Sequence, residues 1–188
     1  MRQLACLTLL LTTATAAWAE SFKLSLADTQ AAAAATFDVV IRVADAGEIG
    51  AMQFDLHYDP AVLRVAKAVP GDLLKKAGAA LESNDGEPGK LRLGWASSKG
   101  VSGDGELIKL RFVAGVKAGA KSPLEFKDVR AWQSKTSLEL LADAQHGSVT
   151  LTAPSLFQNP LLLWIGGGVV GLLVIVVVAR RLNSRRNS

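Results

Sequence analysis

The chain has 188 residues and a formal net charge of +4. The excess of positive charge comes from the two ends of the chain, because Arg2 and four arginines after residue 179 supply five of the 21 lysines and arginines. Residues 20–160 hold the other 16 cations and all 17 carboxylates, a net charge of −1, so nucleic acid is excluded as a partner.

The first 19 residues have the pattern of a secretory signal peptide. Arg2 precedes an apolar run that ends in Ala17-Trp18-Ala19, with small residues at the two positions that a signal peptidase reads. Cleavage before Glu20 removes Cys6, the only cysteine of the chain. The mature protein is therefore expected to have no disulfide and no thiol chemistry.

Residues 20–153 are long enough for one domain with its own core. Alternating apolar and polar residues predict about nine strands, separated by clusters rich in Gly, Asp, Asn and Ser. These strands are 21–26, 36–43, 51–58, 62–69, 90–97, 106–116, 123–129, 137–142 and 146–152. Residues 71–81 allow one short helix, and the alanines of 31–35 are interpreted as a loop. The expected fold is an all-β, antiparallel sandwich or jelly roll.

The strand at 51–58 is expected to have one apolar and one polar side. Met52, Phe54, Leu56 and Tyr58 share the inward side, and the outward side carries Ala51, Gln53, Asp55 and His57. Tyr58-Asp59-Pro60 then ends the strand, since proline has no backbone donor and an aspartate there can cap the turn.

The end of the chain predicts a single membrane span. Residues 154–160 form a short tether, and 161–179 are apolar and free of charge, long enough to cross a bilayer. Clustered arginines in residues 180–188 favour a cytoplasmic tail. These arginines are Arg180, Arg181, Arg185 and Arg186. The expected product is a single-pass membrane protein with its N-terminal domain exported, in the periplasm or on the cell surface.

Several motifs occur in an order that resembles the cohesin family. They are Tyr58-Asp59-Pro60, Val62-Leu63, Pro70-Gly71-Asp72, "GKLRLGWAS" (89–97), "GDGELIKLRFVAGVKAGAKSPLEF" (103–126) and "HGSVTL" (146–151). The resemblance covers the exported domain. It implies a nine-stranded jelly-roll β-sandwich that binds a protein partner, usually a dockerin module that carries its own calcium.

The resemblance also implies a binding surface on the sheet face that includes strand 51–58. The best-known class of the family has an Asn and an Asp where this sequence has Ala51 and Gln53, and its acidic residue after the aromatic corresponds to Ser97. The chain therefore departs from that class at these positions. The residues predicted to bind a protein are Gln53, Asp55, His57, Arg92 and Ser97.

Other functions receive less support from the residues. The two histidines, His57 and His146, belong to no recognisable catalytic motif, so no enzyme activity is expected. The turns at 82–89 and 102–105 lack the spacing of a calcium loop, and no cofactor or metal is expected. Trp132 is the candidate for carbohydrate binding, the first alternative function. A structural role in an envelope complex, held through the glycine-rich span, is the second.

Overall fold

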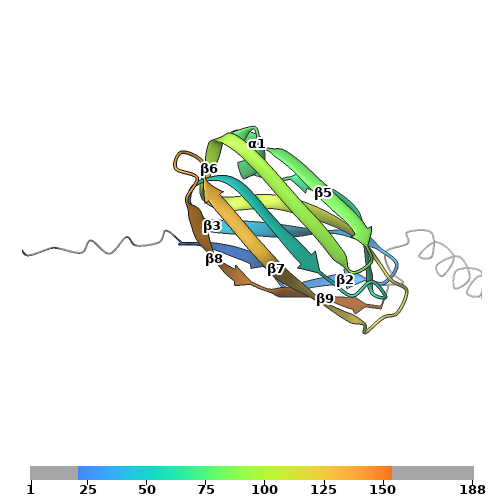
Figure 1. Ribbon diagram of the computed structural model, residues 1–188. Coiled ribbons are helices and arrows are strands. Elements are labelled where there is room, and N and C mark those ends of the chain that lie inside the picture. The colour runs from blue at the N-terminus through green and yellow to red at the C-terminus, as the bar shows by residue number, and fades with distance from the viewer. Residues whose placement is uncertain (1–20, 154–188) are drawn as a thin grey trace, which may run out of the picture.

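The computed structural model describes residues 21–153 (Figure 1). Its strands are β1 Ser21–Leu26, β2 Thr29–Ala32, β3 Thr36–His57, β4 Leu63–Pro70, β5 Ala80–Glu87, β6 Lys90–Ala114, β7 Lys121–Gln133, β8 Glu139–Gln145 and β9 Gly147–Thr152, and the helix is α1 Asp72–Ala77. Within this range, no helix is both long and apolar enough to span a bilayer. The expected signal peptide (1–19), tether (154–160), span (161–179) and tail (180–188) lie outside the described residues.

Two sheets share the long strands β3 and β6, which pair with each other along almost their whole length. In the first sheet, β1 flanks the N-terminal part of β3, β8 flanks β1, and β4 flanks the C-terminal part of β6. In the second sheet, β7 flanks the C-terminal part of β3, and β5 flanks the N-terminal part of β6. The strands β9 and β2 extend this second sheet beyond β7.

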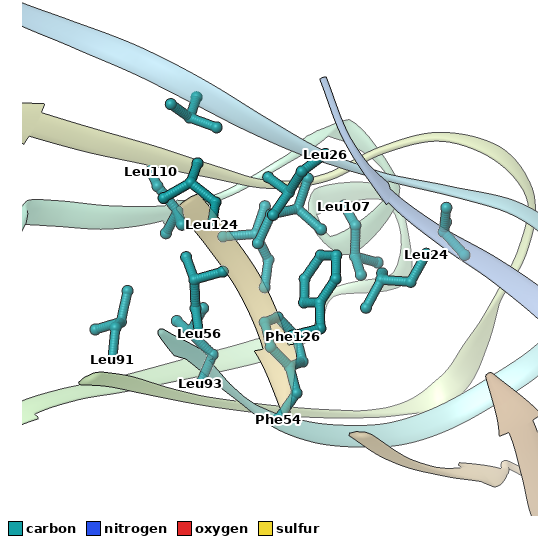
Figure 2. Close-up of a cluster of buried hydrophobic side chains, with 14 of the residues drawn as sticks. Leu24, Leu26, Phe54, Leu56, Leu91, Leu93, Leu107, Leu110, Leu124 and Phe126 are labelled. Carbon is teal, nitrogen blue, oxygen red and sulfur yellow. The ribbon is translucent and has the colours of Figure 1, made fainter. Parts of the chain in front are cut away.

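The core lies between the two sheets and is formed by alternate residues of their strands. Phe54 and Leu56 of β3, Leu93 of β6 and Phe126 of β7 point into it (Figure 2). The rings of Phe54 and Phe126 meet edge to face, with centroids 5.4 Å apart. The inward orientation of this side of strand 51–58 is thereby confirmed. Tyr58 is half-buried and packs against Phe112.

The sequence prediction divided β3 and β6 into two strands each, and the division was wrong. Residues 36–43 and 51–57 belong to the one strand β3, and 90–97 and 106–116 fall mainly within β6. Between the halves of β3, the register with β6 shifts at several points, and Asp45 and Glu48 have positive φ values of 57° and 50°. Such bulges restart the alternation of side chains while the backbone pairing continues, so the sequence there looks like a turn.

Other strand assignments also differ from the prediction. Residues 82–89 were interpreted as a turn, but most of them belong to β5. Ala31 and Ala32 lie in β2 instead of a loop. The expectation of a wholly antiparallel sandwich was wrong at two places, because β1 pairs with β8 and β2 with β9 in parallel. The short helix was confirmed as α1, which ends at Gly78 in the left-handed conformation.

The turn after β3 also has the predicted structure. The carboxylate of Asp59 accepts a hydrogen bond of 2.9 Å from the backbone N–H of Ala61. The chain then re-enters the core at Val62 and Leu63.

Candidate functional site

The outward side of the second sheet forms a surface that we call the outer face. It is built from β5, the N-terminal half of β6, the C-terminal half of β3, and β7, whose cross-strand partners place their side chains in rows. One row holds Ala80, Ala96, Ala51 and Trp132; the next Glu82, Gly94, Gln53 and Arg130; then Asn84, Arg92, Asp55 and Lys127; and last Glu87, Lys90, His57 and Glu125. On β3 and β6 the residues between them, such as Phe54, Leu56 and Leu93, point into the core, whereas Ser83 of β5 is exposed.

An ion-pair cluster lies at the middle of the outer face. Arg92 of β6 donates two hydrogen bonds, of 2.8 and 3.1 Å, to the two carboxylate oxygens of Asp55 on the paired strand β3. The ammonium of Lys90 lies 3.3 Å from the same carboxylate and 3.4 Å from that of Glu87. A guanidinium held by two bonds has a fixed orientation, so Asp55 positions Arg92 on the surface.

The cluster changes the protonation of its members. Hydrogen bonds from Arg92 hold the pKa of Asp55 below its ordinary value of 3.8, against the burial that would raise it. The bond to Asp55 in turn raises the pKa of Lys90 and of Arg92. All three groups are therefore charged at neutral pH.

Three of the predicted binding residues, Gln53, His57 and Arg92, are exposed together on the outer face. Asp55 belongs to the same rows, but it is only 3% exposed and lies beneath its ion pairs. A partner would meet Arg92 and Lys90 instead of this carboxylate.

Ser97 does not share this surface. It follows the buried Trp95 by two residues and is half-buried, and its hydroxyl donates a 2.6 Å hydrogen bond to the carbonyl of Ala77 in α1. This hydrogen bond links β6 to the helix. The residue that reaches the outer face after Trp95 is Ala96, opposite Ala51.

Trp132, the candidate for carbohydrate binding, lies on the outer face. It is half-buried and pairs with Ala51, and Ala51 pairs in turn with Ala96. A large indole beside such small side chains can be approached from solvent on the side of the alanines. This is the environment in which a tryptophan can anchor a protein interface.

Glu82 and Asn84 of β5, and Asp128 and Arg130 of β7, were not predicted to belong to this surface. The first two were overlooked because β5 was interpreted as a turn. Asp128 lies at a bulge with φ of 50°, where the register between β3 and β7 shifts, so simple alternation does not assign its side.

Two hollows lie beside the ion-pair cluster. Asp128 borders one of them, and Arg92 lines both. The two hollows are lined by Gln53, Phe54, Asp55, Arg92 and Asp128, and by Asn84, Gly86, Glu87, Lys90 and Arg92.

The two histidines of the described residues have different surroundings. His57 is exposed on the outer face, and His146 accepts a hydrogen bond through Nδ1 from the backbone N–H of Phe126. Among residues 21–153, no three His, Cys, Asp or Glu side chains gather closely enough to hold a metal ion. The outer face therefore offers a charged surface with two hollows beside Arg92 and with the tryptophan Trp132.

Replacing Asp55 with asparagine should lower the free energy of unfolding at neutral pH by about 1–3 kcal/mol, because charge-assisted hydrogen bonds are lost. The carboxylate has a lowered pKa in the folded state, so its contribution is present above pH 3.8 and is lost as the pH falls through the folded value. Urea unfolding of Asp55→Asn should therefore show a weaker loss of stability on acidification than the parent chain.

The matched control is Asp38→Asn, because Arg111 binds Asp38 with the same two distances on the first sheet. That pair is more exposed, and its loss should cost less than about 1 kcal/mol. Equal losses for the two variants would contradict a special role for Asp55.

The fold and its flat polar surface place the domain among β-sandwich binding modules. The family model "Cohesin domain" matches residues 22–151, and the chain belongs to the cohesin family. Cohesin domains are non-catalytic binding modules, which confirms that the domain is not an enzyme. No curated protein sequence shows a significant match to the chain.

Solved structures with similar folds are also cohesins. A non-cellulosomal cohesin from the archaeon Archaeoglobus fulgidus is 19% identical, with a TM-score of 0.63, and the match covers 71% of this chain and 92% of that one. The sixth cohesin of Acetivibrio cellulolyticus scaffoldin B, in complex with a mutant Cel5 dockerin, is 21% identical (TM-score 0.64; 70% and 99% covered). A cohesin from the Coh-OlpA–Doc918 complex of Clostridium thermocellum is 13% identical (TM-score 0.64; 70% and 99% covered).

Proposed function

We propose that this chain is an exported, membrane-anchored cohesin that binds a protein partner through its outer face. The observation that carries the proposal is the surface on which the fixed Arg92, Gln53, His57 and Trp132 lie together. A broad sheet face with an oriented cation and one aromatic anchor suits a protein partner better than a small ligand.

A dockerin-type module is the class of partner that we propose. Two of the similar structures are complexes of a cohesin with a dockerin. In this chain, Ala51 and Gln53 replace the Asn and Asp of the best-known class, so Arg92 and Trp132 must supply more of the recognition. A dockerin borne by a polysaccharide-degrading enzyme would hold that enzyme at the membrane.

The location is inferred from the sequence. The signal-like residues 1–19, the charge-free residues 161–179 and the arginines after them all favour one topology, with the sandwich outside and the tail in the cytoplasm. Protease added to spheroplasts should degrade the sandwich and leave an epitope on the tail protected. Protection of the sandwich would contradict this topology.

The binding proposal is tested by titrating purified dockerin modules, including the Cel5 dockerin, against the protein in a calorimeter. Arg92→Glu should weaken any binding at least about tenfold, because it removes a cation from the interface and leaves Asp55 beside a like charge. Arg111→Glu is the matched control, since Arg111 donates the same pair of hydrogen bonds to Asp38 on the opposite sheet. It should leave the affinity unchanged.

Two results would contradict parts of the proposal. Absence of binding to every dockerin would reject the partner class, and equal weakening by Arg92→Glu and Arg111→Glu would reject the outer face. Circular dichroism of both variants checks that the fold persists.

A further inference from the structure

The described domain has a well-defined end from which the C-terminal part of the chain leaves. The turn between β6 and β7 (115–120) is fixed to β9, because Gly119 donates a 2.7 Å hydrogen bond to Leu151 and Leu151 donates one of 2.8 Å to Ala120. Backbone bonds from Ala34 to Gly115 and from Gly115 to Val62 bring the neighbouring turns to the same place. We call the surface of these turns the exit end. The described chain begins with β1 at the opposite end of the sandwich (Figure 1).

The exit end exposes an apolar side chain among cations. Val116 is 87% exposed, the most exposed large hydrophobic residue among those described. Lys117 follows it, and Lys121 and Arg64 are exposed on the adjoining strands β7 and β4. None of these three cations has an ion-pair partner among residues 21–153.

Among the turns that form the exit end (33–35, 59–62 and 115–120), the one carboxylate is Asp59. It accepts a backbone hydrogen bond from Ala61, which leaves its negative charge in place. Three cations and this single carboxylate make the net charge of the exit end positive, and its chemical match is an anionic surface.

The length of the chain after β9 limits what can cover the exit end. Only residues 154–160 separate the sandwich from the apolar run that begins at Leu161. Even fully extended, seven residues reach about 25 Å. If the run spans the bilayer, as the proposed function requires, the exit end faces the headgroups at high effective concentration, where a weak contact is sufficient.

We propose that the exit end rests on anionic lipid headgroups of the membrane that anchors the chain. Lys117, Lys121 and Arg64 attract the headgroups, and Val116 enters the interfacial layer. This contact directs the long axis of the sandwich away from the bilayer. The outer face is then presented from the side to a partner, and the start of β1 points away from the membrane.

The test uses the full chain, with Cys6→Ser, in nanodiscs of phosphatidylcholine with or without phosphatidylglycerol. A fluorophore is attached at Ala118→Cys in the exit end. In a separate sample it is attached at Lys99→Cys, in the middle part of β6 where the strand passes from the second sheet to the first. Nitroxide on the lipid headgroups should quench the label at 118 more strongly than the label at 99. The difference should increase with phosphatidylglycerol and decrease at high salt, which screens surface charges.

Lys117→Glu with Lys121→Glu should remove the part of the quenching that depends on phosphatidylglycerol. The same reversal at Lys75 and Lys76 of α1 is the matched control and should leave it intact. Quenching that is equal in both lipids and insensitive to the exit-end reversal would overturn the inference.

Flotation of the chain with vesicles after a high-pH wash measures the anchor separately. A chain that floats but shows no lipid-dependent quenching would retain its anchor without the proposed contact. A chain that does not float would overturn the anchor and the contact together, while dockerin titration would still report on the outer face.

Discussion

Replacing Phe54 with alanine should lower the free energy of unfolding by about 3–5 kcal/mol. Phe54 is 1% exposed, and its ring contacts that of Phe126 across the two strands below the outer face (Figure 2). The change leaves a cavity and removes the edge-to-face pair. A typical domain has about 5–15 kcal/mol of stability in total, so the loss is a large fraction. Urea unfolding followed by tryptophan fluorescence measures it.

Two other variants make this result interpretable. Phe54→Leu keeps most of the buried volume and should lose much less stability, whereas Phe37→Ala removes a half-buried ring and should fall between them. Phe54 also lies between Gln53 and Asp55, so partner binding should decline with the folded fraction. A loss below about 1 kcal/mol for Phe54→Ala would contradict the described core.

Replacing Trp132 with alanine should weaken binding of the protein partner by about thirtyfold or more, with a much smaller effect on folding. Central tryptophans of interfaces contribute about 2 kcal/mol or more, and 1.4 kcal/mol is a factor of ten in affinity. Trp132 is half-buried and lies between the small Ala51 of β3 and Glu139 of β8, so part of the indole is available to a partner on the side of Ala51. Calorimetric titration of the partner measures the change.

Val40→Ala is the control for this experiment. Val40 is half-buried on the outward side of the first sheet, so its loss should not alter binding. Retention on immobilised polysaccharides, lost with Trp132→Ala while protein binding is unchanged, would favour the carbohydrate-binding alternative. Unchanged affinity for the partner would place the centre of the interface elsewhere on the outer face.

Local patterns predicted the parts of the fold that depend on neighbours in sequence. Alternation placed Met52, Phe54 and Leu56 in the core, and the aspartate before Pro60 caps its turn as expected. Both features involve residues within a few positions of each other. The cohesin resemblance added the order of the motifs, and the family match over residues 22–151 agrees with it.

Long-range pairing decided what local patterns could not. The bulges at Asp45 and Glu48 join two expected strands into β3, and pairing with β6 makes a strand of the turn-like β5. The alternation of side chains along a strand shows which residues share a face only as far as the next bulge, where the order of the two faces is reversed. A residue within a bulge, such as Asp128 between the paired Lys127 and Arg130, is placed only by the tertiary structure.

The candidate site shows the same division. The sequence identified Gln53, His57 and Arg92 as outward residues, and all three are exposed on one face. It could not show that Asp55 lies beneath Arg92 and Lys90, because the three residues come from strands that are separated by more than thirty positions. It also could not show that Ser97 turns toward α1, or that Trp132 lies beside Ala51.

By itself, the sequence determined the class of fold, the core side of each regular strand and the balance of charge along the chain, because these follow from residue type and spacing. Only the tertiary structure decided which charges neutralise each other, which carboxylate is buried and which turns meet at the exit end. These depend on register between distant strands, and register is set by the packing of the whole sandwich.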